Sequence, residues 1–287
     1  MSAVATGAKP YYYVPQPSHW PITGSFALLL MGSGAAFWFN SYPAGPWMVA
    51  VGFALLVFML FGWFGTVIGE SEGHLYNKKV DISFRWSMSW FIFSEVMFFA
   101  AFFGALFYIR NLSVPELGSL GSKLIWPNYA AQWPTNGPYE TGHFTPMGAI
   151  GIPLLNTIIL LTSGVTLTIA HHALKAGNRA QLKLWLFLTI ALGFLFVGFQ
   201  AYEYHHAYSE MNLKLSTGVY GSTFFMLTGF HGLHVTIGAT MLLVMLFRVF
   251  KGHFDAEHHF AFEASAWYWH FVDVVWLLLF VLVYWLV

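Results

Sequence analysis

The sequence predicts an all-α polytopic membrane protein with seven transmembrane helices, and three observations lead to this prediction. Asp, Glu, Lys and Arg make up 8% of the 287 residues, against about 25% in an ordinary soluble domain. Hydrophobic residues make up 57% of the chain, and apolar runs of about 20 residues, the length that crosses a bilayer, recur along it. Within these runs apolar residues occupy odd and even positions alike, which indicates helices rather than barrel strands.

The seven predicted spans follow one another along the chain and differ in their polar content. Five have apolar centres free of Asp, Glu, Lys and Arg, whereas the third contains Glu95 and the seventh contains Asp273. Trp and Tyr residues near several span ends suit the headgroup layer, which favours amphipathic rings. The predicted spans, in order, are residues 20–40, 47–69, 83–110, 149–173, 182–207, 218–249 and 263–287.

The connection over residues 111–148 is the longest segment outside the predicted spans. It contains five Pro and several Gly, and these residues interrupt regular helices. We therefore expect an ordered or partly ordered non-helical cap here rather than a folded domain, so that residues 1–287 form a single seven-helix unit.

The distribution of Lys and Arg predicts that the N-terminus lies inside and the C-terminus outside. Loops on the cytoplasmic side of a membrane protein carry an excess of these residues. With the N-terminus inside, three of the twelve cations fall outside, namely Arg110, Lys123 and Lys214. The others fall inside: Lys9, Lys78, Lys79, Arg85, Lys175, Arg179, Lys183, Arg248 and Lys251.

Composition also excludes several kinds of partner and site. A formal net charge of zero argues against nucleic acid, because a phosphate-binding surface needs clustered Lys and Arg. The chain has no Cys, so neither a disulfide framework nor a thiolate metal site is expected. Met1 to His19 lacks the short apolar core of a signal peptide, so we expect the first span to direct insertion.

Glu95 is the first candidate functional residue. It is the only Asp, Glu, Lys or Arg between Trp86 and Ile109, and at about 1.5 Å per residue it lies roughly 18 Å beyond Ser83, near the bilayer midplane. A charge at such a depth costs about 2.5–3.5 kcal/mol. Its own helix offers no partner except Ser94, so we expect a buried carboxyl that is neutral or easily protonated.

Four further polar residues are predicted at similar depth: Asp273 and His270 in the seventh span, and His231 and His234 in the sixth. Carboxylates and imidazoles at mid-membrane can form a proton relay or an ion site. The simpler alternative, which we favour, is a hydrogen-bonded pair of Asp273 with His270 or His231 that joins the last two helices.

The thirteen His residues raise the question of a metal or haem site. A metal site needs three or four converging ligands, and bis-His haem needs one His from each of two facing helices. Three adjacent pairs at span ends, His171–His172, His205–His206 and His258–His259, point in different directions on a helix. We expect these pairs to act as loop hydrogen bonders or supporting groups, and we predict no metal site in the chain.

Several segments, spread in order from the third span to the last, resemble subunit III of the haem–copper cytochrome c oxidases. With Ser18-His19-Trp20-Pro21 before the first span, the resemblance covers nearly the whole chain. The matching segments are Ser94-Glu95-Val96-Met97-Phe98-Phe99, Pro153-Leu154-Leu155-Asn156-Thr157, Gly218-Val219-Tyr220-Gly221-Ser222-Thr223-Phe224-Phe225, Gly229-Phe230-His231-Gly232-Leu233-His234-Val235 and Trp267-Tyr268-Trp269-His270-Phe271-Val272-Asp273-Val274-Val275-Trp276.

The resemblance implies a non-catalytic subunit with no redox centre of its own, split into a two-helix and a five-helix bundle. The haems and copper would reside in partner subunits, and the complex would pass electrons from cytochrome c to dioxygen and pump protons. The implied partners are subunit I as the main contact, other subunits including subunit II, and phospholipids bound between the bundles. The carbodiimide-reactive carboxylate of the family corresponds to Glu95.

The chain also departs from the family pattern. Gly65 and Gly69 stand where many relatives carry arginines, so Lys78, Lys79 and Arg85 become the candidates for a lipid headgroup. The loop over residues 111–148 is longer than in mitochondrial relatives, which indicates a bacterial oxidase in the inner (plasma) membrane. Two alternatives remain open: the third subunit of a quinol oxidase, and an autonomous proton or ion transporter.

Overall fold

The structure is a computed structural model that describes residues 12–138 and 142–287. The described residues form helices, turns and loops, with no strand among them. Seven helices have the length and hydropathy needed to cross a membrane. The prediction of an all-α protein with seven transmembrane helices is therefore confirmed.

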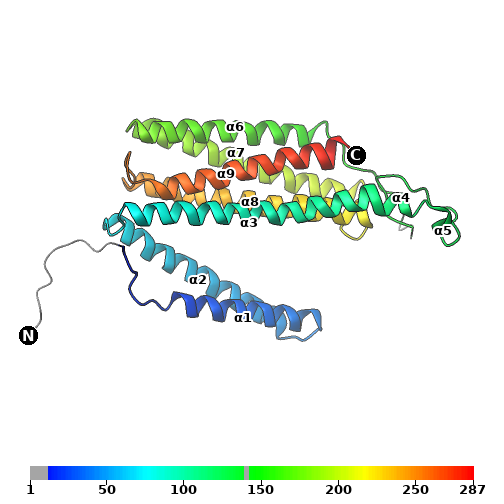
Figure 1. Ribbon diagram of the computed structural model, residues 1–287, viewed down its shortest axis with the longest axis horizontal. Coiled ribbons are helices and arrows are strands. Elements are labelled where there is room, and N and C mark those ends of the chain that lie inside the picture. Colours follow the sequence, from blue (N-terminus) through cyan, green and yellow to red (C-terminus); the bar gives the residue numbers. More distant parts are fainter. Residues whose placement is uncertain (1–11, 139–141) are drawn as a thin grey trace, which may run out of the picture. The chain divides into compact units, whose positions relative to one another are not determined.

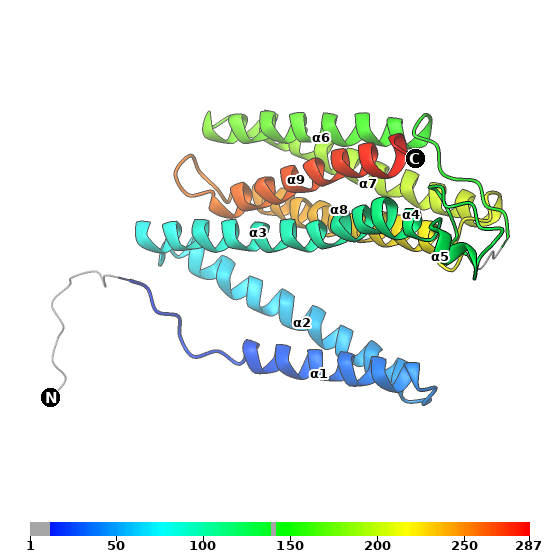
Figure 2. The same cartoon turned by 45° about the vertical axis from the view of Figure 1, so that its right-hand side comes forward.

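The chain divides into two compact units, Met1–Phe84 and Arg85–Val287. In the first unit α1 (Trp20–Phe39) and α2 (Gly45–Glu72) form a hairpin and lie side by side (Figures 1 and 2). Glycines allow the close approach: a Cβ added to Gly34 of α1 or to Gly52 of α2 would lie 2.8 Å from an atom of the other helix. Lipid supplies no hydrophobic driving force between helices, so such helices associate through the close packing that small residues allow.

The second unit is a five-helix bundle, which α3 enters at Arg85. Its helices run alongside one another in both views (Figures 1 and 2), so the chain has the two-helix and five-helix division that the family resemblance implies. The five helices are α3 (Lys78–Tyr108), α6 (Ile152–Lys175), α7 (Arg179–Ser209), α8 (Val219–Phe250) and α9 (Phe260–Leu279), the last continued by a π-helical segment, η2 (Phe280–Trp285).

Four helices begin earlier than the predicted spans, namely α2, α3, α7 and α9, and a polar residue caps two of them, α3 and α7. Asn77 accepts hydrogen bonds at Oδ1 from the backbone N–H groups of Lys79 and Val80, at 3.1 Å each, and α3 begins at Lys78. The Asn178 side chain accepts from the N–H of Gln181 at 3.2 Å, before α7. Such caps satisfy N–H groups that have no partner inside the helix.

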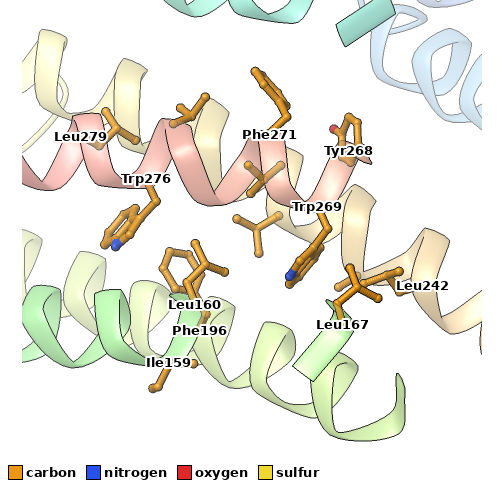
Figure 3. Packing of buried hydrophobic residues seen from close by; sticks show 14 of the residues in the cluster. Ile159, Leu160, Leu167, Phe196, Leu242, Tyr268, Trp269, Phe271, Trp276 and Leu279 are labelled. Carbon is orange, nitrogen blue, oxygen red and sulfur yellow. The ribbon is translucent and has the colours of Figure 1, made fainter. Parts of the chain in front are cut away.

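The core of the second unit lies around α9. Trp269 and Trp276 are fully buried, and Figure 3 shows their rings among apolar side chains of the neighbouring helices. Phe196 of α7 packs edge-on against Trp276 with ring centroids 4.7 Å apart. The aromatic rings fill this layer and hold α9 against its neighbours.

The connection over residues 111–148 is only partly as predicted. Its expected non-helical character is wrong at the start, where α3 continues through the π-helical segment η1 (Ile109–Ser113) into α4 (Val114–Glu116), and α5 (Leu120–Lys123) follows. Pro115 lies in the short helix α4, directly after η1, where its ring removes one backbone donor from the helix. The remaining described residues are irregular, and residues 139–141 lie outside the description.

Candidate functional site

Glu95 has a partner on another helix. Its Oε2 lies 2.9 Å from Nε2 of His234, which projects from α8 and is 139 residues away in the sequence. The side chains are largely buried, with 21% of Glu95 and 10% of His234 exposed. Ser94, the adjacent polar residue, instead donates its hydroxyl to the carbonyl of Phe91. The two helices therefore bring together two of the predicted site residues.

The second ring nitrogen of His234 determines where a proton must lie. Nδ1 is 2.6 Å from the carbonyl oxygen of Phe230, and because a carbonyl can only accept, Nδ1 must carry a hydrogen. A neutral His234 then has a lone pair at Nε2, so Glu95 must be protonated and donate to it. The other arrangement is an imidazolium beside a carboxylate. In either case one proton lies between Glu95 and His234, and the pair has no net charge.

Aromatic rings surround this pair. Phe99 and Phe98 of α3 lie with their centroids 5.0 and 5.8 Å from that of the His234 ring. The ring of Tyr268 of α9 is nearly parallel to the imidazole at 6.3 Å. These neighbours supply few polar partners, so an uncompensated charge on either member would be poorly solvated.

Asp273 lies beside His270, which is one of the two partners predicted for it. Oδ2 of Asp273 is 3.4 Å from Nδ1 of His270, and Nε2 of His270 is 3.4 Å from the hydroxyl of Thr168 on α6. Both contacts are longer than a typical hydrogen bond. Asp273 is 6% exposed, and it packs so closely on Gly164 of α6 that an added Cβ there would lie 2.4 Å from Oδ2.

His231 is separate from both pairs. It is fully buried, and neither ring nitrogen has a hydrogen-bond partner among the described residues. Its ring stacks on Trp276 at 5.2 Å and meets Phe196 edge-on at 5.7 Å. The alternative that paired Asp273 with His231 is therefore wrong: the imidazole is packed among aromatic rings. No potential metal-binding group of three among the described residues includes His231, His234 or His270.

The three predicted headgroup cations differ in their surroundings. Lys78 and Lys79 are exposed in the first turn of α3, where the first unit ends. Arg85 instead forms an ion pair with Glu263 of α9, with Nη1 and Oε2 2.7 Å apart. Its guanidinium also lies over the ring of Phe260, 5.3 Å from the centroid. Arg85 thus contributes to packing within the second unit.

A further buried acid, Glu203 of α7, was not among the predicted site residues. It is 1% exposed, and both carboxylate oxygens lack a hydrogen-bond partner among the described residues, as does the hydroxyl of Tyr284. Its position could have been found from helical spacing. One buried stripe along α7 consists of Phe196, Gln200, Glu203 and Ala207. In the sequence, the neighbouring polar and aromatic residues obscure this stripe.

Comparisons with known proteins agree with the resemblance. The family described as cytochrome c oxidase subunit III matches residues 9–287. Similar proteins include cytochrome c oxidase subunit 3 of Dugong dugon, of Carassius auratus and of Squalus acanthias, each 45% identical over 276 residues that cover 96% of both chains. The chain accordingly belongs to the cytochrome c oxidase subunit III family.

Proposed function

We propose that the chain is a supporting subunit of a respiratory cytochrome c oxidase that transfers electrons from cytochrome c to dioxygen and pumps protons. Haems and copper would reside in partner subunits, and this chain would hold no redox centre and no active site. Membership of the subunit III family supports this role. Subunit I would be the main contact, and subunit II a further member of the complex.

The role proposed for Glu95 is to support proton uptake. The observation that carries it is the 2.9 Å contact with His234, which holds one proton in a partly exposed position. Release of that proton would leave a charge among aromatic rings, so these surroundings favour the state in which the pair holds it. The pair would hold a proton close to the catalytic subunit and would not take part in the oxygen chemistry.

Binding of phospholipids and the membrane setting complete the proposal. Lys78 and Lys79 are exposed cations at the start of a membrane helix, where an anionic headgroup adds about 1 kcal/mol per cation. Their inside location, with the N-terminus inside and the C-terminus outside, rests on the excess of Lys and Arg in that set of loops. Assignment to a bacterial inner membrane rests on the long 111–148 connection alone.

The test replaces Glu95 in the assembled oxidase. E95Q keeps a hydrogen-bonding side chain of similar size but cannot release a proton, so we expect normal assembly, unchanged haem spectra and slower proton uptake, most evident at alkaline pH, where protons are scarce. D273N is the matched control, because it also changes a buried acid beside a His, and it should retain the rate of wild type.

Four outcomes would contradict the proposal. If E95Q took up protons at the wild-type rate at every pH, the Glu95–His234 pair would have a structural role only. If E95Q failed to assemble, the hydrogen bonding of Glu95 would be required for assembly. A stoichiometric haem pigment in the purified chain would overturn the supporting role. Gradient-driven proton flux through proteoliposomes of the chain alone, abolished by E95Q, would favour an autonomous transporter.

A further inference from the structure

A second group of ionisable side chains lies in the bundle away from the Glu95–His234 pair. It comprises His171 in the last turns of α6, and His259 and Glu263 at the start of α9. One ligand atom from each residue lies within 4.8 Å of the other two. His259 and Glu263 are four residues apart, so they share one face of α9. Two helices thus converge on one point with three groups that bind metals.

The hydrogen bond of His259 leaves its other nitrogen available for a ligand. Nδ1 is 3.0 Å from the carbonyl oxygen of Asp255, and since the carbonyl accepts, Nδ1 carries the hydrogen and neutral Nε2 keeps its lone pair. His259 is 7% exposed, so water is largely kept from this ring. Metal-binding His residues commonly donate their second N–H to a backbone carbonyl in this way.

His171 presents a buried nitrogen that lacks a partner. Its Nε2 has no hydrogen bond among the described residues, although buried polar atoms are normally satisfied. The His171 and His259 rings meet edge to face with centroids 5.4 Å apart, and Phe262 lies 5.6 Å from the His171 ring. A cation between the two imidazoles would give Nε2 of His171 the partner that it lacks.

Glu263 completes the group with a negative charge. Its Oε2 lies 2.7 Å from Nη1 of Arg85, which fixes the orientation of the carboxylate and leaves Oε1 outside this ion pair. Other charges near the group are Lys175, one turn after His171, and the exposed pair of Asp255 and His258. Two imidazoles and one oriented carboxylate are a ligand set typical of zinc, with water in the fourth position.

We propose that His171, His259 and Glu263 bind a divalent transition-metal ion of the zinc type. Calcium and magnesium fit poorly because they prefer oxygen ligands, whereas two of the three ligands here are imidazoles. The ion links the end of α6 to the start of α9. This assignment departs from the expectation of no metal in the chain, and it makes His171 and His259 ligands where the sequence suggested loop or supporting roles.

The test measures zinc binding to the purified full-length chain in detergent. After incubation with zinc chloride and gel filtration, we expect one bound equivalent in wild type. In each of H171N, H259N and E263Q that equivalent is lost, or its affinity falls about tenfold or more. Zinc should also raise the unfolding temperature of wild type but not of these variants. Bound cobalt should show the visible absorption of a tetrahedral site, which added zinc removes.

Matched controls come from the residues next to two ligands. H172N and H258N remove a His of the same adjacent pair without touching the group, so both should retain the bound equivalent. Wild type without stoichiometric zinc, or ligand variants that retain it, would overturn the assignment. E263Q and H171N change different helices. If circular dichroism shows that one of these variants is not folded, zinc binding to the other still tests the assignment.

Discussion

Trp276 of α9 donates its indole N–H to the hydroxyl of Thr157 on α6 across 2.9 Å, although 119 residues separate them in the sequence. Thr157 in turn donates its own hydrogen to the carbonyl of Pro153 at 2.8 Å. Trp269 and Ser163 repeat the arrangement at 2.9 Å. The polar edges of both fully buried indoles are therefore satisfied by a single neighbouring helix.

T157A is expected to lower the free energy of unfolding by roughly 0.6–1.7 kcal/mol, the range for hydrogen bonds between membrane helices. The substitution leaves the indole N–H of Trp276 buried without a partner. T162A is the control, because the Thr162 hydroxyl is bonded to the carbonyl of Ile158 in its own helix. Denaturant unfolding of the purified chain compares the two, and equal losses would mean that the indole bond contributes nothing measurable.

G164A should separate α6 from α9. The new Cβ would lie 2.4 Å from Oδ2 of Asp273, so one of the helices has to shift, at a typical cost of about 1–3 kcal/mol for overpacking. G198A on α7 is the control, since its Cβ would meet no atom within 4 Å and Ala favours a helix over Gly. Thermal unfolding should show a lower midpoint for G164A only.

E95L is expected to destabilise the chain where E95Q does not. Gln can donate an amide hydrogen to Nε2 of His234 and preserve the contact, whereas Leu leaves that nitrogen without a partner in an aromatic environment. The expected difference is about 0.6–1.7 kcal/mol, as for other interhelical hydrogen bonds. Unfolding of both variants in the same detergent checks it. If E95Q loses as much as E95L, the ionised form of the pair matters for stability.

The turn before α9 should open in acid. The backbone N–H of His258 donates to the Asp255 carboxylate at 2.5 Å, helped by the N–H of Glu257 at 2.8 Å, and these bonds lower the pKa of Asp255 below its ordinary value of 3.8. Because the folded state favours the ionised form, this stabilisation is complete above the ordinary value and is lost as pH falls below it.

Amide hydrogen exchange of His258 measures this opening. We expect protection in wild type to decline below about pH 3.8, more than intrinsic exchange rates account for. D255N keeps a side-chain oxygen acceptor that does not titrate in this range, so its protection should be independent of pH there. D255A should be unprotected throughout. A wild type that follows D255N down to the lowest pH would show that the carboxylate charge does not hold the turn.

Contacts within one helix were predictable from the sequence, whereas contacts between helices were not. His270 precedes Asp273 by three residues, so helical geometry alone placed them together. The partner of Glu95 lies 139 residues away, and hydropathy says which segments span the membrane but not which faces meet. The expectation that the acid has a partner came from the cost of burying it; the identity of His234 required the fold.

The two His residues of α8 show the limit of helical spacing. His231 and His234 are three positions apart and share a broad face, so the sequence treats them alike. In the bundle a small rotation separates their surroundings: His234 meets Glu95, and His231 lies between aromatic rings. The side-chain packing of several helices determines this difference, and the hydropathy of one helix cannot predict it.

The neutrality of the Glu95–His234 pair has a consequence for how it responds to membrane voltage. A full charge that crosses the bilayer gains about 2.3 kcal/mol per 100 mV. The proton can move at most the 2.9 Å between the two heavy atoms, about a tenth of a hydrocarbon core that is roughly 30 Å thick. Voltage therefore biases its position by only about 0.2 kcal/mol per 100 mV, well below thermal energy. The position of this proton depends on its chemical surroundings and is nearly unaffected by whether the membrane is energised.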